Sequence, residues 1–145
     1  MGTTIVICYM DGKNTYISHV GDSRAYLYKD TLKQITADDT FVNELVKRGL
    51  INAEEASHHP KRNVLVQAIG IKEALRISFY KIEEDYRAIL LCSDGLYNSL
   101  SSQQIEEILQ KNASVDQKTE CLIQSANEFG GLDNIGVLLI EKGEA

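Results

Sequence analysis

Residues 88–100 read AILLCSDGLYNSL, an uninterrupted apolar run that changes abruptly to Ser93, Asp94 and Gly95. The run is too short to cross a membrane. Its length and its lack of polar alternation favour a strand that is buried on both faces of a sheet. Such a strand fixes the position of the residue that follows it. We therefore expect the Asp94 carboxylate to be held at a defined place at the edge of the core.

The patterns around this run predict an α+β fold. Strand-like segments occupy residues 3–10, 15–20, 24–29, 32–36, 75–82, 86–92 and 133–141. Helical spacing or capping patterns mark residues 41–49, 52–59, 101–109 and 114–129. Short turns between the first strands predict antiparallel pairing, and helices that come in blocks predict separate layers. We expect two packed sheets with helices outside, in a single domain over residues 1–145.

Charge and cysteine usage narrow the class of protein. The net charge of −6 disfavours a nucleic-acid partner, which requires a basic surface. Cys8, Cys92 and Cys121 stand in apolar surroundings at no metal-like spacing, so they are interpreted as small core residues. Their sparse, odd number favours a reducing compartment, and we expect a cytoplasmic location. We see no signal peptide and no transmembrane run, and we expect no membrane partner.

Three aspartates share one context. Asp22, Asp94 and Asp133 each adjoin a strand-like segment and have a glycine within three residues. Converging carboxylates repel one another unless a cation lies between them, and hard oxygen ligands select Mg²⁺, Mn²⁺ or Ca²⁺. The alternative is ordinary turn chemistry, in which an aspartate bonds its own backbone. Sequence spacing alone does not show that the three side chains converge.

Four motifs in series resemble a known family. They read VGDSRAYLY, QITADDTFVNELVKRGLINAEEASHHPKRNVLVQAIG, LLCSDGLYNSLS and GGLDNIGVLLI, and they cover nearly the whole chain. In this order they are similar to motifs of the bacterial metal-dependent serine/threonine protein phosphatases, the PPM or PP2C family. The resemblance implies a β-sandwich flanked by helices in an α-β-β-α arrangement. It also implies two Mn²⁺ or Mg²⁺ ions that activate a water for attack on the phosphorus of phosphoserine or phosphothreonine.

The resemblance also implies roles for individual residues. Asp94 and Asp133 would ligate the first catalytic metal, and Asp22 and Asp94 would share a weaker third site. Asn134 would orient Asp133 without binding the metal itself. Gly95 is likewise expected next to the metal ligands and not among them. Residues 43–63 correspond to the mobile flap beside the active site, and its candidate flap and substrate residues are Asn43, Arg62 and Asn63. The implied partners are phosphoprotein substrates and a cognate serine/threonine kinase.

Part of the family pattern has no counterpart in this sequence. The family's arginine-bearing strand, acidic pair and DGMGG metal loop precede the strand that corresponds to residues 3–10, and none of them is found here. The resemblance therefore implies a partial domain, truncated at the N-terminus, with an incomplete binuclear site. We expect the chain alone to be weak or inactive, and the alternative is a non-catalytic scaffold or regulatory module. Exposed sheet edges would favour a homo-oligomer.

A cysteine-dependent phosphatase is excluded on chemical grounds. Cys92 is followed by SDGLYN, and no arginine stands six residues on to hold the phosphate of a cysteinyl intermediate. The glycine-rich loop of a nucleotide-binding protein is also missing from the sequence.

Overall fold

The protein is described here by a computed structural model, which covers residues 1–71, 74–131 and 133–143. The strands are β1 (Ile5–Met10), β2 (Thr15–Val20), β3 (Arg24–Tyr28), β4 (Leu32–Gln34), β5 (Ser78–Ile82), β6 (Ala88–Cys92) and β7 (Val137–Glu141). The helices are α1 (Phe41–Lys47), α2 (Ala53–His58), α3 (Asp94–Tyr97), α4 (Ser102–Leu109) and α5 (Val115–Phe129).

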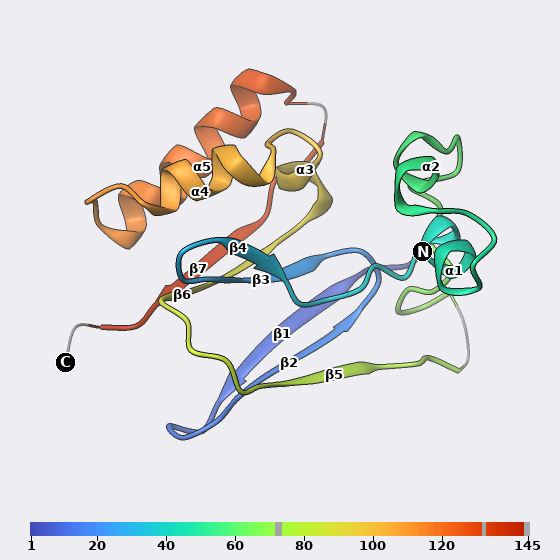
Figure 1. Ribbon diagram of the computed structural model, residues 1–145, viewed down its shortest axis with the longest axis horizontal. Helices are drawn as coiled ribbons and strands as arrows, with labels where there is room; N and C mark the ends of the chain where they lie inside the picture. Colours follow the sequence, from blue (N-terminus) through green and yellow to red (C-terminus); the bar gives the residue numbers. More distant parts are fainter. Residues whose placement is uncertain (72–73, 132, 144–145) are drawn as a thin grey trace.

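The strands form two antiparallel sheets that pack face to face. One sheet has the order β1-β2-β5 and the other the order β4-β3-β6-β7. Figure 1 shows the second sheet between the first and the helices α4 and α5, while α1 and α2 lie together at one end of the sandwich. The α+β class expected from the pattern of elements is therefore confirmed.

Two hydrophobic clusters lie on the two sides of β6. Ile89 and Leu91 point toward β1-β2-β5 and contact Ile17 in the cluster between the sheets. Leu90 and Cys92 point the other way, into the cluster that α4 and α5 cover. All five residues of β6 are buried, so the apolar run is confirmed as a strand enclosed on both faces.

Local sequence signals explain where several elements begin. Ser101 and Ser114 accept hydrogen bonds from the backbone N–H groups of Gln104 and Gln117, whose side chains bond back to the serine N–H groups. Both capping patterns were expected from the sequence and are confirmed. In the β1–β2 hairpin, Gly12 has a φ of 87°, a value that glycine adopts at low cost. Strands β1, β5, β6 and β7 begin two to four residues later than their patterns indicate, and the short helix α3 was not expected.

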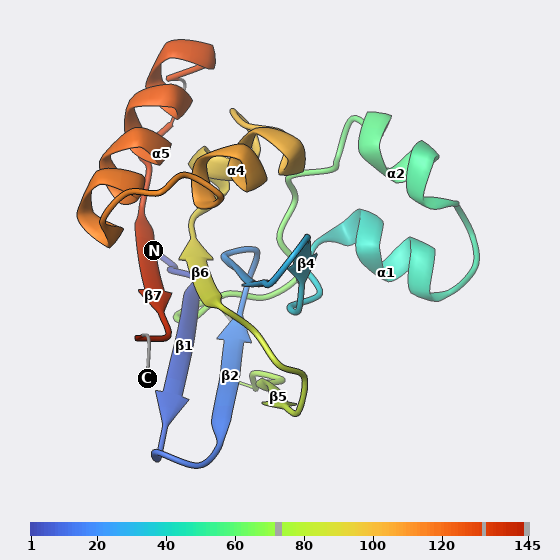
Figure 2. The ribbon, with the colours of Figure 1, turned by 60° about the vertical axis from the view of Figure 1, so that its left-hand side comes forward.

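The α1–α2 segment joins the end of the sandwich through backbone bonds. Asp39 N–H donates to the Gly21 carbonyl at 2.9 Å, and Val66 N–H donates to the Asp39 carbonyl at 2.8 Å. Figure 2 shows α1 and α2 set to one side, clear of the sheet faces. In the part of the chain that the structure describes, none of the helices combines the length and the hydrophobicity needed to cross a membrane.

Truncation of Leu90 tests the role of β6. Its side chain is 0% exposed, so Leu90→Ala should lower the free energy of unfolding by about 3 kcal/mol through lost burial and a residual cavity. Leu138→Ala, at a site on β7 that is 50% exposed, is the matched control and should cost less than about 1 kcal/mol. Urea titration followed by circular dichroism measures both. Equal losses would contradict the central place of β6 in the core.

Candidate metal centre

Three adjacent strand ends place the candidate aspartates at one edge of the larger sheet. Arg24, at the start of β3, pairs with Cys92 at the end of β6, and Cys92 pairs with Val137 at the start of β7. Asp22 precedes β3, Asp94 follows β6, and Asp133 precedes β7. Because neighbouring antiparallel strands start and end at a shared edge, all three acids leave the sheet from the same end.

The electrostatics of these acids reflect their proximity. Burial raises the pKa of Asp22, and the charges of Asp94 and Asp38 raise it further. Burial likewise raises the pKa of Asp94, and the charge of Asp133 adds to the effect. Asp94 is thus electrostatically coupled to both other acids. A divalent cation relieves this kind of repulsion between carboxylates.

The loop that carries Asp133 is packed against α3 by two small residues. A side chain at Gly95 would collide with the Asn134 carbonyl, since an added Cβ would lie 2.3 Å from that oxygen. The Ser93 hydroxyl accepts from Gly136 N–H at 2.8 Å and donates to the Asn134 carbonyl at 3.2 Å. Gly95 therefore permits, and Ser93 fixes, the approach of this loop to Asp94.

Asn134 contacts Asp133 through the backbone. Its N–H donates to Asp133 Oδ1 at 2.7 Å, and both residues are exposed. This bond holds one of the two carboxylate oxygens of Asp133. An orienting role for the Asn134 side chain stays a prediction.

A compact polar cluster holds the turn that carries Asp22. The Tyr97 hydroxyl on α3 donates to the Asp22 carbonyl at 2.8 Å. The Arg24 guanidinium lies 3.5 Å from the centre of the Tyr97 ring and bonds Asp38 through two nitrogens, the shorter contact being 2.7 Å. Arg24 Nη1 also donates to the Tyr26 hydroxyl at 3.0 Å. These contacts connect the backbone of Asp22 to the helix that begins with Asp94.

A buried carboxylate fixes the other side of the same turn. Asp39 is 4% exposed, and its Oδ2 accepts from Gly21 N–H at 2.9 Å and from Gln67 Nε2 at 2.7 Å. Gly21 has a φ of 107°, in the left-handed region that favours glycine. Arg24, Asp39 and Tyr97 were not recognised as parts of the site from the sequence. Their partners lie far along the chain, and no periodic signal marks them.

The donor set suits a hard cation, but the site is not closed. All three side chains offer carboxylate oxygens, the ligands that Mg²⁺ and Mn²⁺ prefer. Within residues 1–71, 74–131 and 133–143, however, no three His, Cys, Asp or Glu side chains are arranged so that they could hold a metal ion. The structure brings the acids to one edge in coupled pairs, and further oxygen ligands would be required for a complete coordination sphere.

The candidate flap residues lie on the α1–α2 segment. Asn43 Nδ2 donates to the Asp38 carbonyl at 2.7 Å, which connects α1 to the carboxylate held by Arg24. Arg62 and Asn63 are exposed on the turn that follows α2. For the described residues, no hydrogen bond or ion pair joins either of these two side chains to the three aspartates.

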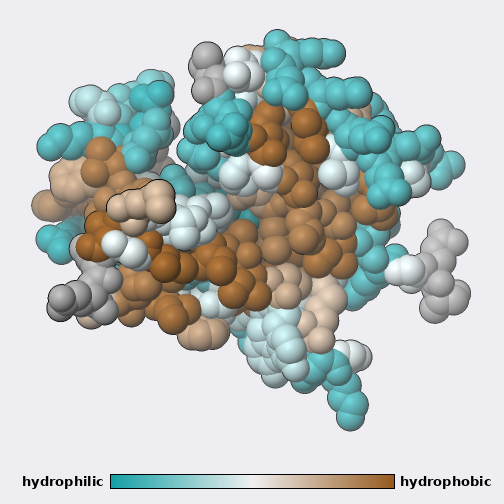
Figure 3. Space-filling model, turned by 180° about the vertical axis from the view of Figure 1, so that it is seen from behind, coloured by the Kyte–Doolittle hydropathy of each residue, from teal (hydrophilic) through white to brown (hydrophobic). Residues whose placement is uncertain are grey.

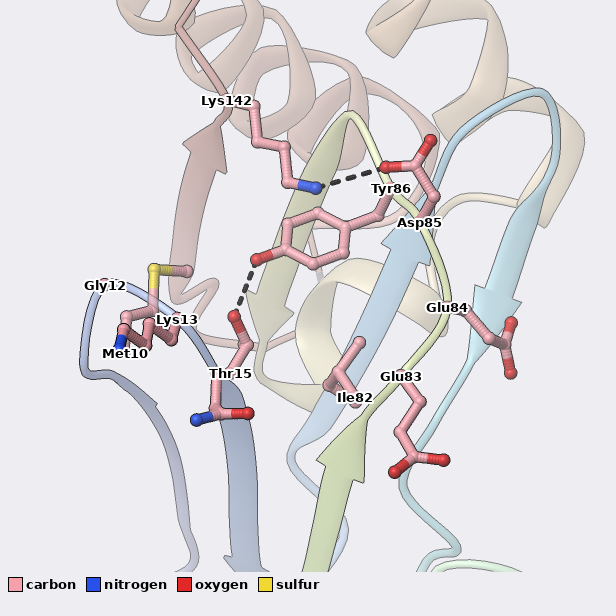
Figure 4. Close-up of a pocket in the computed structure, with 11 residues that line it drawn as sticks. Met10, Gly12, Lys13, Thr15, Ile82, Glu83, Glu84, Asp85, Tyr86 and Lys142 are labelled. Carbon is pink, nitrogen blue, oxygen red and sulfur yellow. Dashed lines mark hydrogen bonds and ion pairs between the residues drawn. The ribbon is translucent and has the colours of Figure 1, made fainter.

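A pocket of about 500 Å³ opens at the far end of the sandwich, beside the β1–β2 hairpin. In its wall the Thr15 and Tyr86 hydroxyls bond at 2.7 Å and Lys142 bonds Asp85 at 3.2 Å (Figure 4). None of the three candidate aspartates lines it. This pocket and the acidic edge are therefore separate features.

Substitution of Arg24 tests the polar cluster. Arg24→Ala leaves the largely buried Asp38 and Tyr26 without their partner, and should lower the free energy of unfolding by about 2 kcal/mol. Arg87→Ala is the control, because Arg87 pairs with Asp30 at 3.6 Å on an exposed surface, and it should cost less than about 0.5 kcal/mol. Urea titration gives both values. Similar losses of unfolding free energy in the two variants would show that Arg24 contributes no more than an ordinary surface ion pair.

Comparisons with known proteins assign the family. No protein-family model matches the chain. The serine/threonine phosphatase stp of Listeria welshimeri is 40% identical over 144 residues, which span 98% of this chain and 57% of that protein. The protein phosphatase PhpP of Streptococcus pneumoniae is 40% identical over 149 residues, which span 99% of this chain and 59% of that protein.

The solved structures agree with the sequence relatives. The serine/threonine phosphatase of S. agalactiae superposes with a TM-score of 0.91 at 36% identity, over 98% of this chain and 60% of its own. The catalytic domain of the phosphatase PstP, solved with two manganese ions, superposes with a TM-score of 0.76 at 37% identity over 96% of this chain and 58% of its own. The chain thus spans less than two thirds of the relatives that it matches. It belongs to the PPM family of serine/threonine protein phosphatases.

Proposed function

We propose that this chain supplies the Asp22, Asp94 and Asp133 edge of a metal-dependent phosphatase that hydrolyses phosphoserine and phosphothreonine in proteins. The observation that carries the proposal is the register β3-β6-β7, which brings three acids to one sheet edge where their charges interact. Relatives with 40% identity are named serine/threonine phosphatases, and one solved neighbour was crystallised with two manganese ions.

The metal-ligand roles proposed here are those that the resemblance to the family implies, and the contacts of the neighbouring residues support them. Asp94 and Asp133 would hold one Mn²⁺ or Mg²⁺ ion, and Asp22 with Asp94 would hold a weaker one. Such ions, when bound, lower the pKa of a water and neutralise charge on phosphate oxygens. Tyr97 keeps the Asp22 turn in place, and Ser93 keeps the Asp133 loop beside α3. These residues thereby preorganise the oxygen ligands before any ion binds.

The substrates proposed for this site are phosphoproteins, with a cognate serine/threonine kinase as a functional partner. The α1–α2 segment, with Asn43, Arg62 and Asn63, would form the neighbouring flap. Asn43 supports this placement because it bonds the backbone of Asp38, which Arg24 ties to the metal edge. The three free cysteines fit a reducing compartment, and we propose the cytoplasm.

The activity proposed for the isolated chain is weak or absent. The chain spans 57% of the Listeria relative, and the described residues contain no group of three His, Cys, Asp or Glu side chains that could hold a metal ion. These two observations also favour a second candidate function, a non-catalytic phosphatase-like scaffold. The two functions are separated by metal binding, which only the first requires.

Substitution of Asp94 tests the proposed function. Asp94→Asn removes the charge shared by both proposed ion sites, and should weaken Mn²⁺ binding roughly tenfold or more, because affinity follows ligand charge. Asp116→Asn, at an exposed position in the first turn of α5, is the matched control and should leave binding unchanged. Calorimetric titration with MnCl₂ measures both. Unaltered Mn²⁺ binding by Asp94→Asn would contradict the assignment, and absence of binding in the parent chain would favour the scaffold.

The reactivity of Cys92 tests the exclusion of thiol chemistry. Burial raises the pKa of the Cys92 thiol to about 12, so at pH 8 the group is protonated and enclosed. Iodoacetamide should alkylate Cys92 far more slowly in the native protein than in urea, while Cys8 and Cys121, which are only partly buried, should react before it. Peptide mass spectrometry measures the sites. Rapid alkylation of Cys92 in the native protein would contradict the exclusion of a cysteine-dependent mechanism.

A further inference from the structure

The pocket at the far end of the sandwich has no part in the proposed metal site. Its volume is about 500 Å³, and three segments that lie far apart in the sequence line it. They are the β1–β2 hairpin, the loop between β5 and β6, and the segment that follows β7. Pockets that bind small molecules typically have volumes of roughly 300 to 1,000 Å³. The pocket is therefore large enough for a small ligand.

The surroundings of this pocket are polar. Seen from behind, a broad hydrophobic area crosses the middle of the molecule, and the β1–β2 hairpin projects below it with a hydrophilic tip (Figure 3). Residues 12–15 of the hairpin and the acidic residues 83–85 of the opposite loop line the pocket, and Met10 and Ile82 supply the aliphatic part of the lining. Such a lining suits a polar ligand with a small apolar part.

Two buried hydroxyl groups in the wall cannot satisfy each other completely. Thr15 and Tyr86 are both 8% exposed, and their hydroxyl oxygens lie 2.7 Å apart (Figure 4). Each hydroxyl carries one donor hydrogen, and the bond between them uses only one of the two. The second hydrogen has no acceptor among the residues that the structure describes. Because buried donors are normally bonded, this part of the wall favours a ligand with an oxygen acceptor.

Positive charge gathers beside the same ring. The Lys142 ammonium lies 4.0 Å from the centre of the Tyr86 ring and bonds Asp85 at 3.2 Å. Asp85 also pairs with Lys29 at 3.0 Å, so two ammonium groups share one carboxylate. Hydrogen bonds from Lys29 and Lys142 lower the pKa of Asp85, which is therefore ionised at neutral pH. Two positive charges and one negative charge leave a net charge of +1 on these three groups.

The two glutamates of the lining do not cancel this charge, because each has a lysine of its own. Glu84 pairs with Lys33, and Glu83 pairs with Lys81 at 3.5 Å. Neither of these lysines lines the pocket. Figure 4 shows the Glu84 side chain turned away from Tyr86. The side of the pocket at Tyr86 therefore presents a hydrogen-bond donor and an excess of positive charge.

We propose that this pocket binds a small organic carboxylate. One carboxylate oxygen would accept from the hydroxyl pair of Thr15 and Tyr86, and the other would pair with the Lys142 ammonium, a charge-assisted bond. The carbon part of the ligand would contact Met10 and Ile82. A free acid and the C-terminus of a peptide present the same group, and the test distinguishes these two sources. Binding requires neither metal nor catalysis, so it goes beyond the proposed function.

The test compares two carboxylates with their uncharged amides. The probes are benzoate with benzamide, and acetyl-trialanine with acetyl-trialanine amide, titrated into the labelled chain in buffer with EDTA. In amide nuclear magnetic resonance spectra, a carboxylate probe should shift Thr15, Tyr86 and Lys142 in a saturable way. Its amide should bind roughly tenfold or more weakly, because it lacks the charge. Tighter binding of benzoate would identify a free acid as the ligand, and tighter binding of acetyl-trialanine a peptide C-terminus.

Two variants test the individual contacts. Lys142→Gln removes the ammonium from a side chain that is 51% exposed, and should weaken binding of the better carboxylate probe roughly tenfold. The double variant Thr15→Val, Tyr86→Phe removes both hydroxyls and leaves neither unpaired, so the fold should tolerate it while binding weakens to a similar extent. Lys47→Gln on α1 is the matched control, because its side chain is 48% exposed and does not line the pocket, and it should have no effect.

Several outcomes would overturn the proposal. Absence of a saturable shift with either carboxylate would show that the pocket is not such a site. Equal binding of a carboxylate and its amide would show that the charge is not recognised. Unchanged affinity in Lys142→Gln, or an equal loss in Lys47→Gln, would show that the probe binds elsewhere or nonspecifically. Because EDTA is present throughout, failure of the proposed metal function cannot produce any of these results.

Discussion

The enclosure of β6 on both faces is the constraint on which the rest of the structure depends. The side chains of β6 that point toward β1-β2-β5 pack between the two sheets, and those on its other face pack against α4 and α5. Because the strand is clamped between two layers, its register with β3 and β7 is fixed, since a slip by one residue would exchange the two sets of side chains. That register brings Asp22, Asp94 and Asp133 to one end of the sheet, and the local contacts of the Asp22 turn and the Asp133 loop hold them there.

The candidate metal edge combines a rigid frame with mutual repulsion. Tyr97, Arg24 and Asp39 hold the Asp22 turn from two sides, and Gly95 and Ser93 hold the Asp133 loop. These contacts hold the backbone that carries Asp22 and Asp133 near Asp94, whose charge interacts with both acids. A cation that binds there would stabilise the folded chain, because it binds the folded state and not the separated ligands of the unfolded one.

The sequence indicated the parts of this structure that depend on local chemistry. The apolar run of β6, the first hairpin and the caps at Ser101 and Ser114 all follow from neighbouring residues. The polar contacts around the Asp22 turn could not be predicted in this way. Tyr97 and Asp22 lie 75 positions apart in the chain and meet only once β3 and β6 have paired. Helix α3 was missed because it has one turn and no periodic apolar face. The three acids were identified as candidates because each lies next to a strand. That they lie near one another could be known only once the order of the strands in the sheet was known.

The register β3-β6-β7 brings the three acids to the place where we propose that a divalent ion binds. Paramagnetic broadening by trace Mn²⁺, followed in amide nuclear magnetic resonance spectra of the labelled chain, locates such an ion. The amides of Asp22, Asp94 and Asp133 should broaden first and together, while those of Glu83 and Glu84, in the acidic wall of the distant pocket, should stay sharp. Broadening that begins at Glu83 and Glu84 and spares the strand ends would contradict the proposed site.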